Sequence, residues 1–166
     1  GVQTCALPIL LHALMPGLFV WEIQQPTDRT YRVADWGRGA ADRPLHRVEA
    51  MQAVNLDAVA QRRPRLPETP GIHTILDEGA LRAVAVVGPW SGAIDAQPDA
   101  VATHVPSPSP RASRTDEVES ARCGDCSLRP FNSARLGDGP VHVDVPGGGT
   151  LLVGSIRRPL HARTRG

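Results

Sequence analysis

The chain has 166 residues, enough for one folded domain or for one domain and a tail. All 18 basic residues are arginine, and the 17 acidic residues leave a formal net charge of +1. This balance argues against a nucleic-acid partner or a charged membrane surface, because both require clustered positive charge. No stretch reaches the roughly 20 apolar residues that span a bilayer, so we expect a cytoplasmic protein.

Residues 1–9 are excluded from biological interpretation. Their sequence, GVQTCALPI, is similar to the in-frame translation of a common sequencing-adapter oligonucleotide. The chain also begins without Met, so we expect a gene fragment joined to a short artefact. Without Cys5, only Cys123 and Cys126 remain, which are too few for a secreted disulfide scaffold.

Two strands are predicted between residues 18 and 36. Residues 18–24 alternate so that Glu22 and Gln24 share one face and the bulky apolar residues share the other. Residues 30–36 are rich in Tyr, Val, Trp and Thr and favour a second strand. Such a meander is typical of a β-barrel or jelly roll. The residues expected in its core are Phe19, Trp21, Ile23 and Trp36.

The run HALMPGLFVWEIQQPTDRTYRVADWGR, residues 12–38, resembles the late strands of the catalytic cupin in type I mannose-6-phosphate isomerases. HAL, a glycine turn, EIQQ, TYR and DWGR occur in that family's order and spacing. A weaker likeness continues through residues 46–57, so the resemblance covers about residues 11–60. It implies a mainly β, cupin-like jelly-roll or β-barrel fragment in residues 10–60, with one helix and then a partial C-terminal β domain.

His12 matches a histidine that binds the catalytic metal of this family, usually zinc. A neutral imidazole on the inward face of a barrel strand is a good zinc ligand. The resemblance places the other ligands, a Gln-x-His pair and a Glu, on strands upstream of the start of this chain. A lone histidine outside such a context is more often a structural residue.

Arg32, in TYR, matches the family's active-site arginine. Isomerisation of an aldose to a ketose passes through an enediolate, whose developing oxyanion a fixed guanidinium can stabilise. Without the resemblance, Arg32 reads as a surface residue paired with Asp28 or Asp35. Glu22 and Gln24 are candidates for hydrogen bonds to the sugar or for supporting polar contacts.

The next part of the chain predicts one helix and then two strands. Pro44 suits a first helical turn, and apolar residues follow at helical spacing through residue 55, so we expect that stripe to pack in a core. Residues 61–90 are interpreted as a proline-rich linker and the start of the C-terminal β domain. Within them, residues 72–76 and 81–87 read as strands around a turn at 77–79. The helical stripe consists of Leu45, Val48, Met51, Ala53 and Val54.

The last third carries weaker signals. Residues 91–122 are rich in Pro and Ser and predict either a disordered insertion or a misread frame, which the sequence does not separate. Residues 123–166 predict a hairpin of 141–145 with 150–153 about the turn 146–149, and then a basic tail. Cys123 and Cys126 form a C-x-x-C pair, for which a chance occurrence is favoured over half of a zinc knuckle or a redox motif.

The sequence therefore predicts a fragment of a zinc-dependent isomerase acting on a sugar phosphate, mannose 6-phosphate or fructose 6-phosphate. Alone, it is expected to be inactive and to bind zinc poorly, because most of the ligands lie outside it. One alternative is a non-catalytic cupin that binds sugars. Another is a small zinc or thiol protein centred on Cys123 and Cys126.

Overall fold

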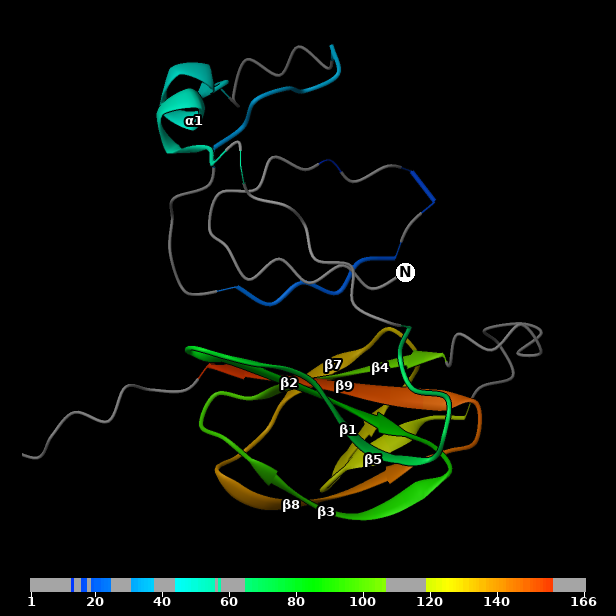
Figure 1. The fold of residues 1–166 in the computed structure, drawn as a ribbon. Coiled ribbons are helices and arrows are strands. Elements are labelled where there is room, and N and C mark those ends of the chain that lie inside the picture. Colours follow the sequence, from blue (N-terminus) through cyan, green and yellow to red (C-terminus); the bar gives the residue numbers. More distant parts are fainter. Residues whose placement is uncertain are drawn as a thin grey trace, which may run out of the picture. The chain divides into compact units, whose positions relative to one another are not determined.

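The computed structural model describes residues 13, 16–17, 19–24, 31–37, 44–55, 57, 65–106 and 119–156. The chain divides into two compact units, Gly1–Pro64 and Arg65–Gly166. The fold is mainly β, with a single helix among the described residues and antiparallel strands in the second unit (Figure 1). Within these residues there is no helix of the length and apolar character needed to cross a bilayer.

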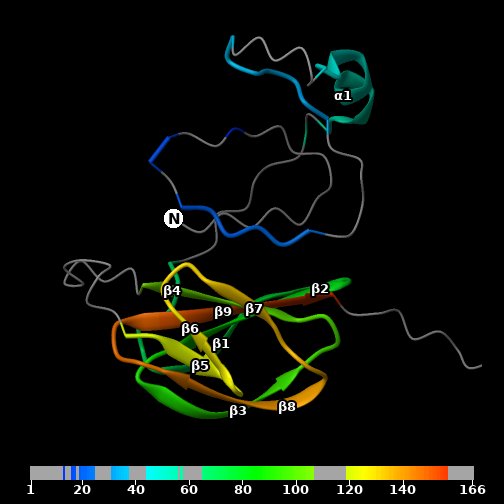
Figure 2. The same ribbon diagram turned by 180° about the vertical axis from the view of Figure 1, so that it is seen from behind.

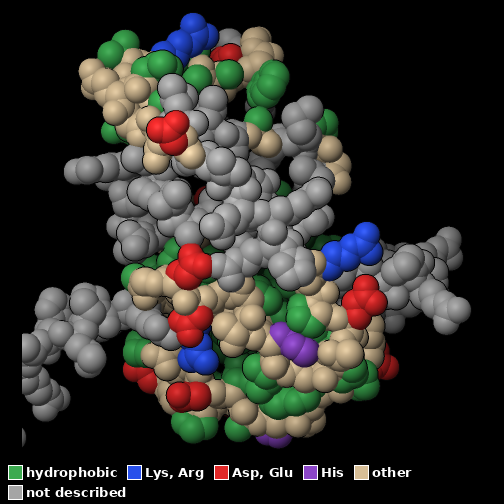
Figure 3. Space-filling model, in the orientation of Figure 1, with side chains coloured by type: hydrophobic (Ala, Val, Ile, Leu, Met, Phe, Trp, Pro, Cys, Tyr) green, Lys and Arg blue, Asp and Glu red, His purple; other side chains and the backbone are tan. Residues whose placement is uncertain are grey.

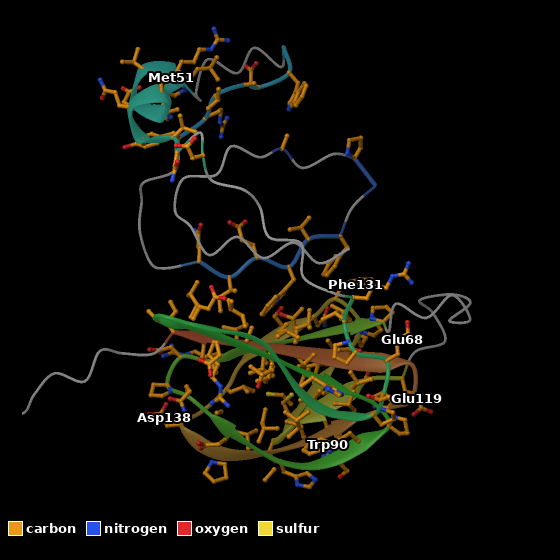
Figure 4. All side chains as sticks on the ribbon, viewed as in Figure 1. Met51, Glu68, Trp90, Glu119, Phe131 and Asp138 are labelled. Atoms are coloured by element: carbon orange, nitrogen blue, oxygen red, sulfur yellow. The ribbon has the colours of Figure 1, made fainter. Side chains whose placement is uncertain are left out.

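The helix of the first unit, α1, spans Arg47–Ala53 and is shorter than predicted. His46 precedes it with a non-helical backbone (φ −111°, ψ 52°), so the helix begins after Pro44 rather than at it. The expected core packing of its apolar stripe is wrong. Val48 and Met51 are 69% and 68% exposed, and no residue of α1 is buried; Met51 is labelled in Figure 4. A helical period shows which residues share a face, but it does not ensure that another element covers that face.

The two strands predicted between residues 18 and 36 are not formed among the described residues. Residues 19–24 and 31–35 belong to no strand in the described part of the chain, although Trp21 and Ile23 are half-buried while Glu22 and Gln24 are exposed. Exposure thus alternates with a period of two along residues 21–24, although these residues are not part of a sheet among the described residues. An extended segment becomes a strand only when a neighbour takes up its backbone hydrogen bonds.

The expected core of this segment is likewise only partly realised. Phe19 and Trp36 are 57% and 68% exposed, against the prediction that both are core residues. Trp36 adopts a left-handed backbone conformation (φ 57°) in the turn with Gly37. Side chains stop alternating between two faces where the backbone turns. The period of two that predicted a core position for Trp36 therefore does not hold at this residue.

The second unit consists of two antiparallel sheets (Figures 1 and 2). One has five strands in the order β1-β2-β9-β4-β7, and the other has four in the order β3-β8-β5-β6. Neither described sheet closes on itself, so the unit is a sandwich of open sheets rather than a closed barrel. The strands are β1 (Gly71–Glu78), β2 (Leu81–Val87), β3 (Trp90–Ala96), β4 (Val101–Pro106), β5 (Ala121–Cys123), β6 (Cys126–Leu128), β7 (Ser133–Arg135), β8 (Gly139–Val145) and β9 (Gly149–Ile156).

The core lies between these sheets. Val86 of β2 and its partner Leu151 of β9 face inward from the five-stranded sheet. Ile94 of β3 and Val143 of β8 face them from the four-stranded sheet. All four belong to one cluster of buried apolar side chains, whose formation is the main source of stability of this unit.

The predicted strands at 72–76 and 81–87 are confirmed as β1 and β2, joined by a turn at 79–80. The expectation of disorder for residues 91–122 is wrong for 91–106 and 119–122. Ile94, Ala96, Ala102 and Val105 are buried there, at positions spread over β3 and β4. Alanine contributes little to a pattern of hydrophobic residues in the sequence. The sequence pattern therefore did not indicate that Ala96 and Ala102 belong to a closely packed core. Residues 107–118 lie outside the described residues.

The predicted hairpin of residues 141–153 has the right strands and the wrong pairing. β8 pairs with β3 and β5, whereas β9 pairs with β2 and β4 in the other sheet. The turn therefore carries the chain from one sheet to the other. Beside it, the link from β2 to β3 makes a second crossing, and the amide of Gly88 donates to the carbonyl of Gly149 at 3.0 Å. Turn residues indicate that a chain reverses, not that the flanking strands pair.

His104 of β4 connects the two sheets from within the core. Its side chain is fully buried, and Nδ1 lies 2.9 Å from the carbonyl oxygen of Leu128 on β6. Because a carbonyl only accepts, Nδ1 carries the proton and Nε2 is the bare nitrogen. Nε2 is buried without a hydrogen-bond partner in the described part of the chain. The imidazole is therefore held in its neutral form.

We expect the second unit to lose stability below about pH 6.5 because of His104. Burial lowers the pKa of its imidazole from the ordinary 6.5, against the opposing effect of the bond to Leu128. Below pH 6.5 the unfolded chain binds a proton that the folded chain does not, so stability falls as pH falls toward the folded pKa and is fully present above 6.5. Urea unfolding between pH 8 and pH 5 measures this, and His104→Asn, which keeps a donor for Leu128, should show a shallower slope. An equal slope in the two proteins would contradict the assignment.

Candidate functional site

Three of the four residues assigned from the sequence lie in the described part of the chain. His12 lies outside the described residues. Glu22 and Gln24 are exposed, and Arg32 is half-buried. Arg32 is therefore less exposed to solvent than Glu22 and Gln24.

The backbone of Arg32 is fixed by a residue that the sequence reading did not single out. The carbonyl of Arg32 accepts from the amide of His46 at 2.7 Å, and the amide of Arg32 donates to Nδ1 of His46 at 3.3 Å. The ring of Tyr31 meets the same imidazole edge to face, with centroids 6.3 Å apart. Arg47 adds a bond from Nε to the carbonyl of Val33 at 3.3 Å. Residues 31–33 are therefore joined to the start of α1.

This arrangement explains why His46 precedes a helix without capping it. Its side chain makes no hydrogen bond to the helix amides, because Nδ1 is engaged by Arg32. The two residues are 14 positions apart, so no local pattern could indicate the contact. A histidine directly before a predicted helix, where Ser, Thr, Asp or Asn is preferred, was the available signal.

The described residues do not make a zinc site. No group of three or more His, Cys, Asp or Glu side chains is placed to hold a metal ion anywhere among them. A catalytic zinc needs three protein ligands and a site open to water or substrate.

The C-x-x-C pair forms a β-hairpin. Cys123 ends β5, Cys126 begins β6, and the two are directly opposite across the turn Gly124–Asp125. Gly124 has φ +54°, a conformation that favours glycine, and its amide donates to the carbonyl of His142 at 2.8 Å. Cys123 is buried and Cys126 is exposed, and both thiols are free.

We expect the two thiols to differ sharply in reactivity. Burial raises the pKa of Cys123 to about 11, with a smaller contribution from the neighbouring Cys126. Because the thiolate is the reacting species, Cys123 should resist alkylation that modifies Cys126. Iodoacetamide at pH 8 followed by peptide mass spectrometry tests this, with the urea-unfolded chain, in which both react, as the control. Equal labelling in the folded chain would contradict the buried position of Cys123.

Ser91, His142 and Asp144 form a second polar group, on the outer face of the four-stranded sheet. Ser91 Oγ donates to Asp144 Oδ1 at 2.5 Å, and His142 Nε2 lies 3.3 Å from both of these oxygens. A catalytic triad places the histidine between the serine and the carboxylate, each on a different ring nitrogen. Here the serine bonds the carboxylate directly, so the group does not have the arrangement of a catalytic triad.

Figure 3 shows the electrostatic character of one face of the molecule. Over the strands, acidic side chains in red and basic ones in blue lie scattered among uncharged groups. Among these charged side chains, Arg135 and Asp99 form an exposed ion pair. Exposed pairs contribute little to stability.

Comparison with protein-family models and with curated proteins finds no match to this chain.

Proposed function

We propose that residues 10–60 are the end of the catalytic cupin of a type I mannose-6-phosphate isomerase, and that the chain is a fragment of such an enzyme. The observation that carries this proposal is the run of residues 12–38, in which several short motifs occur together in the family's order. The proposed substrates are mannose 6-phosphate and fructose 6-phosphate, and the proposed compartment is the cytoplasm.

The geometry around Arg32 is compatible with its proposed role. Proton abstraction beside the sugar carbonyl puts negative charge on an oxygen, and a guanidinium held near that oxygen lowers the barrier. Such stabilisation depends on a side chain that is already in position when the charge develops. The two backbone hydrogen bonds between Arg32 and His46 supply this constraint on the main chain of Arg32.

Glu22 and Gln24 are proposed to hydrogen-bond the sugar or neighbouring polar groups. Their exposure to solvent supports this role. They alternate with the half-buried Trp21 and Ile23, so the polar residues of this segment are more exposed than the apolar ones. His12 is proposed as one zinc ligand, with the others supplied from outside these 166 residues. The chain by itself is therefore proposed to be inactive and to bind zinc poorly.

Sequencing the source DNA upstream of the codon for Leu11 tests the proposal, followed by an assay of the intact gene product. A Gln-x-His pair and a Glu on preceding strands, with turnover of mannose 6-phosphate in a coupled assay, would support it. Loss of turnover on chelation and recovery with zinc would support the metal. Upstream strands without these ligands would overturn it in favour of a sugar-binding cupin, and turnover by the 166-residue chain alone would contradict its inactivity.

A further inference from the structure

The hairpin of β5 and β6 carries two thiols that the proposed isomerase chemistry does not use (Figure 2). Cys123 and Cys126 are cross-strand partners, so their side chains leave the same face of the hairpin. Directly opposite residues of an antiparallel pair have Cα atoms roughly 4.5–5.5 Å apart. A disulfide spans Cα separations of about 4.4–6.8 Å. The backbone of this pair therefore suits a disulfide without any rearrangement of the strands.

The surroundings of the hairpin hold the two cysteines in this register. Gly124, in the turn, has the left-handed conformation that favours glycine, and its amide donates to the carbonyl of His142 on β8 at 2.8 Å. Cys123 is paired with Val143 of β8 on one side and with Cys126 of β6 on the other. The two thiols therefore cannot separate far, and each has a high effective concentration at the other.

The two thiols differ in what can reach them. Cys123 is 4% exposed and belongs to the apolar core, whereas Cys126 is exposed on β6, the end strand of the described four-stranded sheet. A dissolved oxidant therefore meets Cys126 first. Burial raises the pKa of Cys123 to about 11, so this thiol stays protonated and is protected from the oxidant. In redox-sensitive pairs, an accessible cysteine lies next to a second one that resolves its oxidised form.

We propose that Cys123 and Cys126 are a redox-sensitive pair that forms a reversible disulfide on reaction with a hydroperoxide. The thiolate of Cys126 attacks the terminal peroxide oxygen, the O–O bond breaks, and the other oxygen leaves as an alcohol or water with the thiol proton. Cys126 is then a sulfenic acid. The sulfur of Cys123 attacks the sulfur of Cys126, the S–O bond breaks, and the hydroxyl leaves as water with the proton of Cys123. The two thiols lose two electrons in total, which reduce one hydroperoxide.

This bond is suited to exchange more than to support of the fold. It closes the short loop from Cys123 to Cys126, and a disulfide across a short loop restricts the unfolded chain least. The hairpin is already held by its turn and by the pairing of β5 with β8. Cys126 stays accessible to an attacking thiol, so reduced glutathione can reopen the bond.

Oxidation of the reduced Cys5→Ser chain with hydrogen peroxide tests this inference, because that substitution removes the third cysteine of the sequence. Remaining thiols are blocked with iodoacetamide in urea, and the tryptic peptide of residues 123–135, which holds both cysteines, is measured by mass spectrometry. The peptide should lose one hydrogen from each sulfur and take up no alkyl group, in a chain that stays monomeric. Excess reduced glutathione should restore both thiols.

Moving the exposed thiol by one residue is the matched control. Cys126→Ser combined with Ser127→Cys keeps two thiols, but residue 127 pairs with Arg122 and faces the opposite side of the hairpin. Ser127 is exposed, as Cys126 is, so the relocated thiol still meets the oxidant. This variant should form about tenfold less intramolecular disulfide, or less still. In Cys123→Ala, which removes the resolving thiol, Cys126 should accumulate as a sulfenic acid that dimedone traps.

The inference is overturned if the peptide keeps both thiols, if Cys126 passes to a sulfinic acid without a disulfide, or if the disulfide joins two chains. Equal yields from the parent pair and the relocated pair would show that the register of the hairpin does not matter. A disulfide that resists glutathione would contradict its reversibility. The isomerase proposal rests on residues 10–60, so it stands or falls separately from these outcomes.

Discussion

If the full gene product is the isomerase proposed above, replacing Arg32 with glutamine is expected to lower its kcat by about 10²–10³-fold, equivalent to roughly 3–4 kcal/mol of transition-state stabilisation. Glutamine keeps much of the length and polarity of arginine but carries no charge, so it cannot balance the charge that develops on the enediolate oxygen. The measurement is steady-state turnover of mannose 6-phosphate by the full gene product. Because the charge appears only during reaction, kcat should fall far more than KM rises.

Arg47→Gln is the matched control for this loss. Arg47 is exposed and bonds the carbonyl of Val33, one residue from Arg32, so its removal tests for a general loss of positive charge or local order. It should leave kcat within a small factor of the parent enzyme. Similar losses in both variants would assign Arg32 a structural role instead.

Gly88→Ala is expected to destabilise the second unit by about 3 kcal/mol or more. A Cβ on Gly88 would collide with the carbonyl oxygen of Pro146 and would lie 2.6 Å from that of Val145. Both atoms belong to the backbone, so no side-chain rotation can relieve the contact. Denaturant unfolding followed by circular dichroism measures the loss, as a lower transition midpoint with an unchanged slope.

Gly137→Ala provides the comparison. Gly137 is exposed, and nothing lies within 4 Å of the Cβ it would gain. This variant should unfold close to the parent chain, or slightly later because alanine restricts the unfolded state. Equal destabilisation by the two substitutions would show that the crossing near Pro146 is not closely packed.

The sequence predicted strands correctly where apolar residues flank a clear turn, but the alternation of residues 18–24 predicted a strand that is absent from the described residues. Residues 81–87 are a case of the first kind, and β2 appears there as predicted. It failed where the core is built from small residues, because Ala96 and Ala102 are invisible to a pattern of large hydrophobic side chains. The sequence pattern also did not predict which strands pair with one another. Whether β9 bonds to its neighbour in sequence or to β2 and β4 depends on contacts with residues from 43 (Pro106 with Gly149) to 75 (Leu81 with Ile156) positions away.

The candidate site was predictable to the extent that it rests on motifs. Arg32 could be named from the residues around it, and its half-buried position is compatible with the proposed role. The contact with His46 could not be named, because it depends on the path of the chain between residues 33 and 46. Ser91 and Asp144 also carry no local signature. Their proximity follows from the register of two strands far apart in the sequence.

The position of β9 has a consequence for biosynthesis. This strand lies between β2 and β4, yet it leaves the ribosome after every other strand of its sheet. Until it emerges, β2 and β4 each have one edge without a partner, and Val86 lacks the neighbour Leu151. Unpaired edges of this kind are sites of aggregation. This sheet therefore cannot be completed until residues 149–156 have emerged, and nascent chains that stall before residue 149 are expected to be the species that chaperones retain.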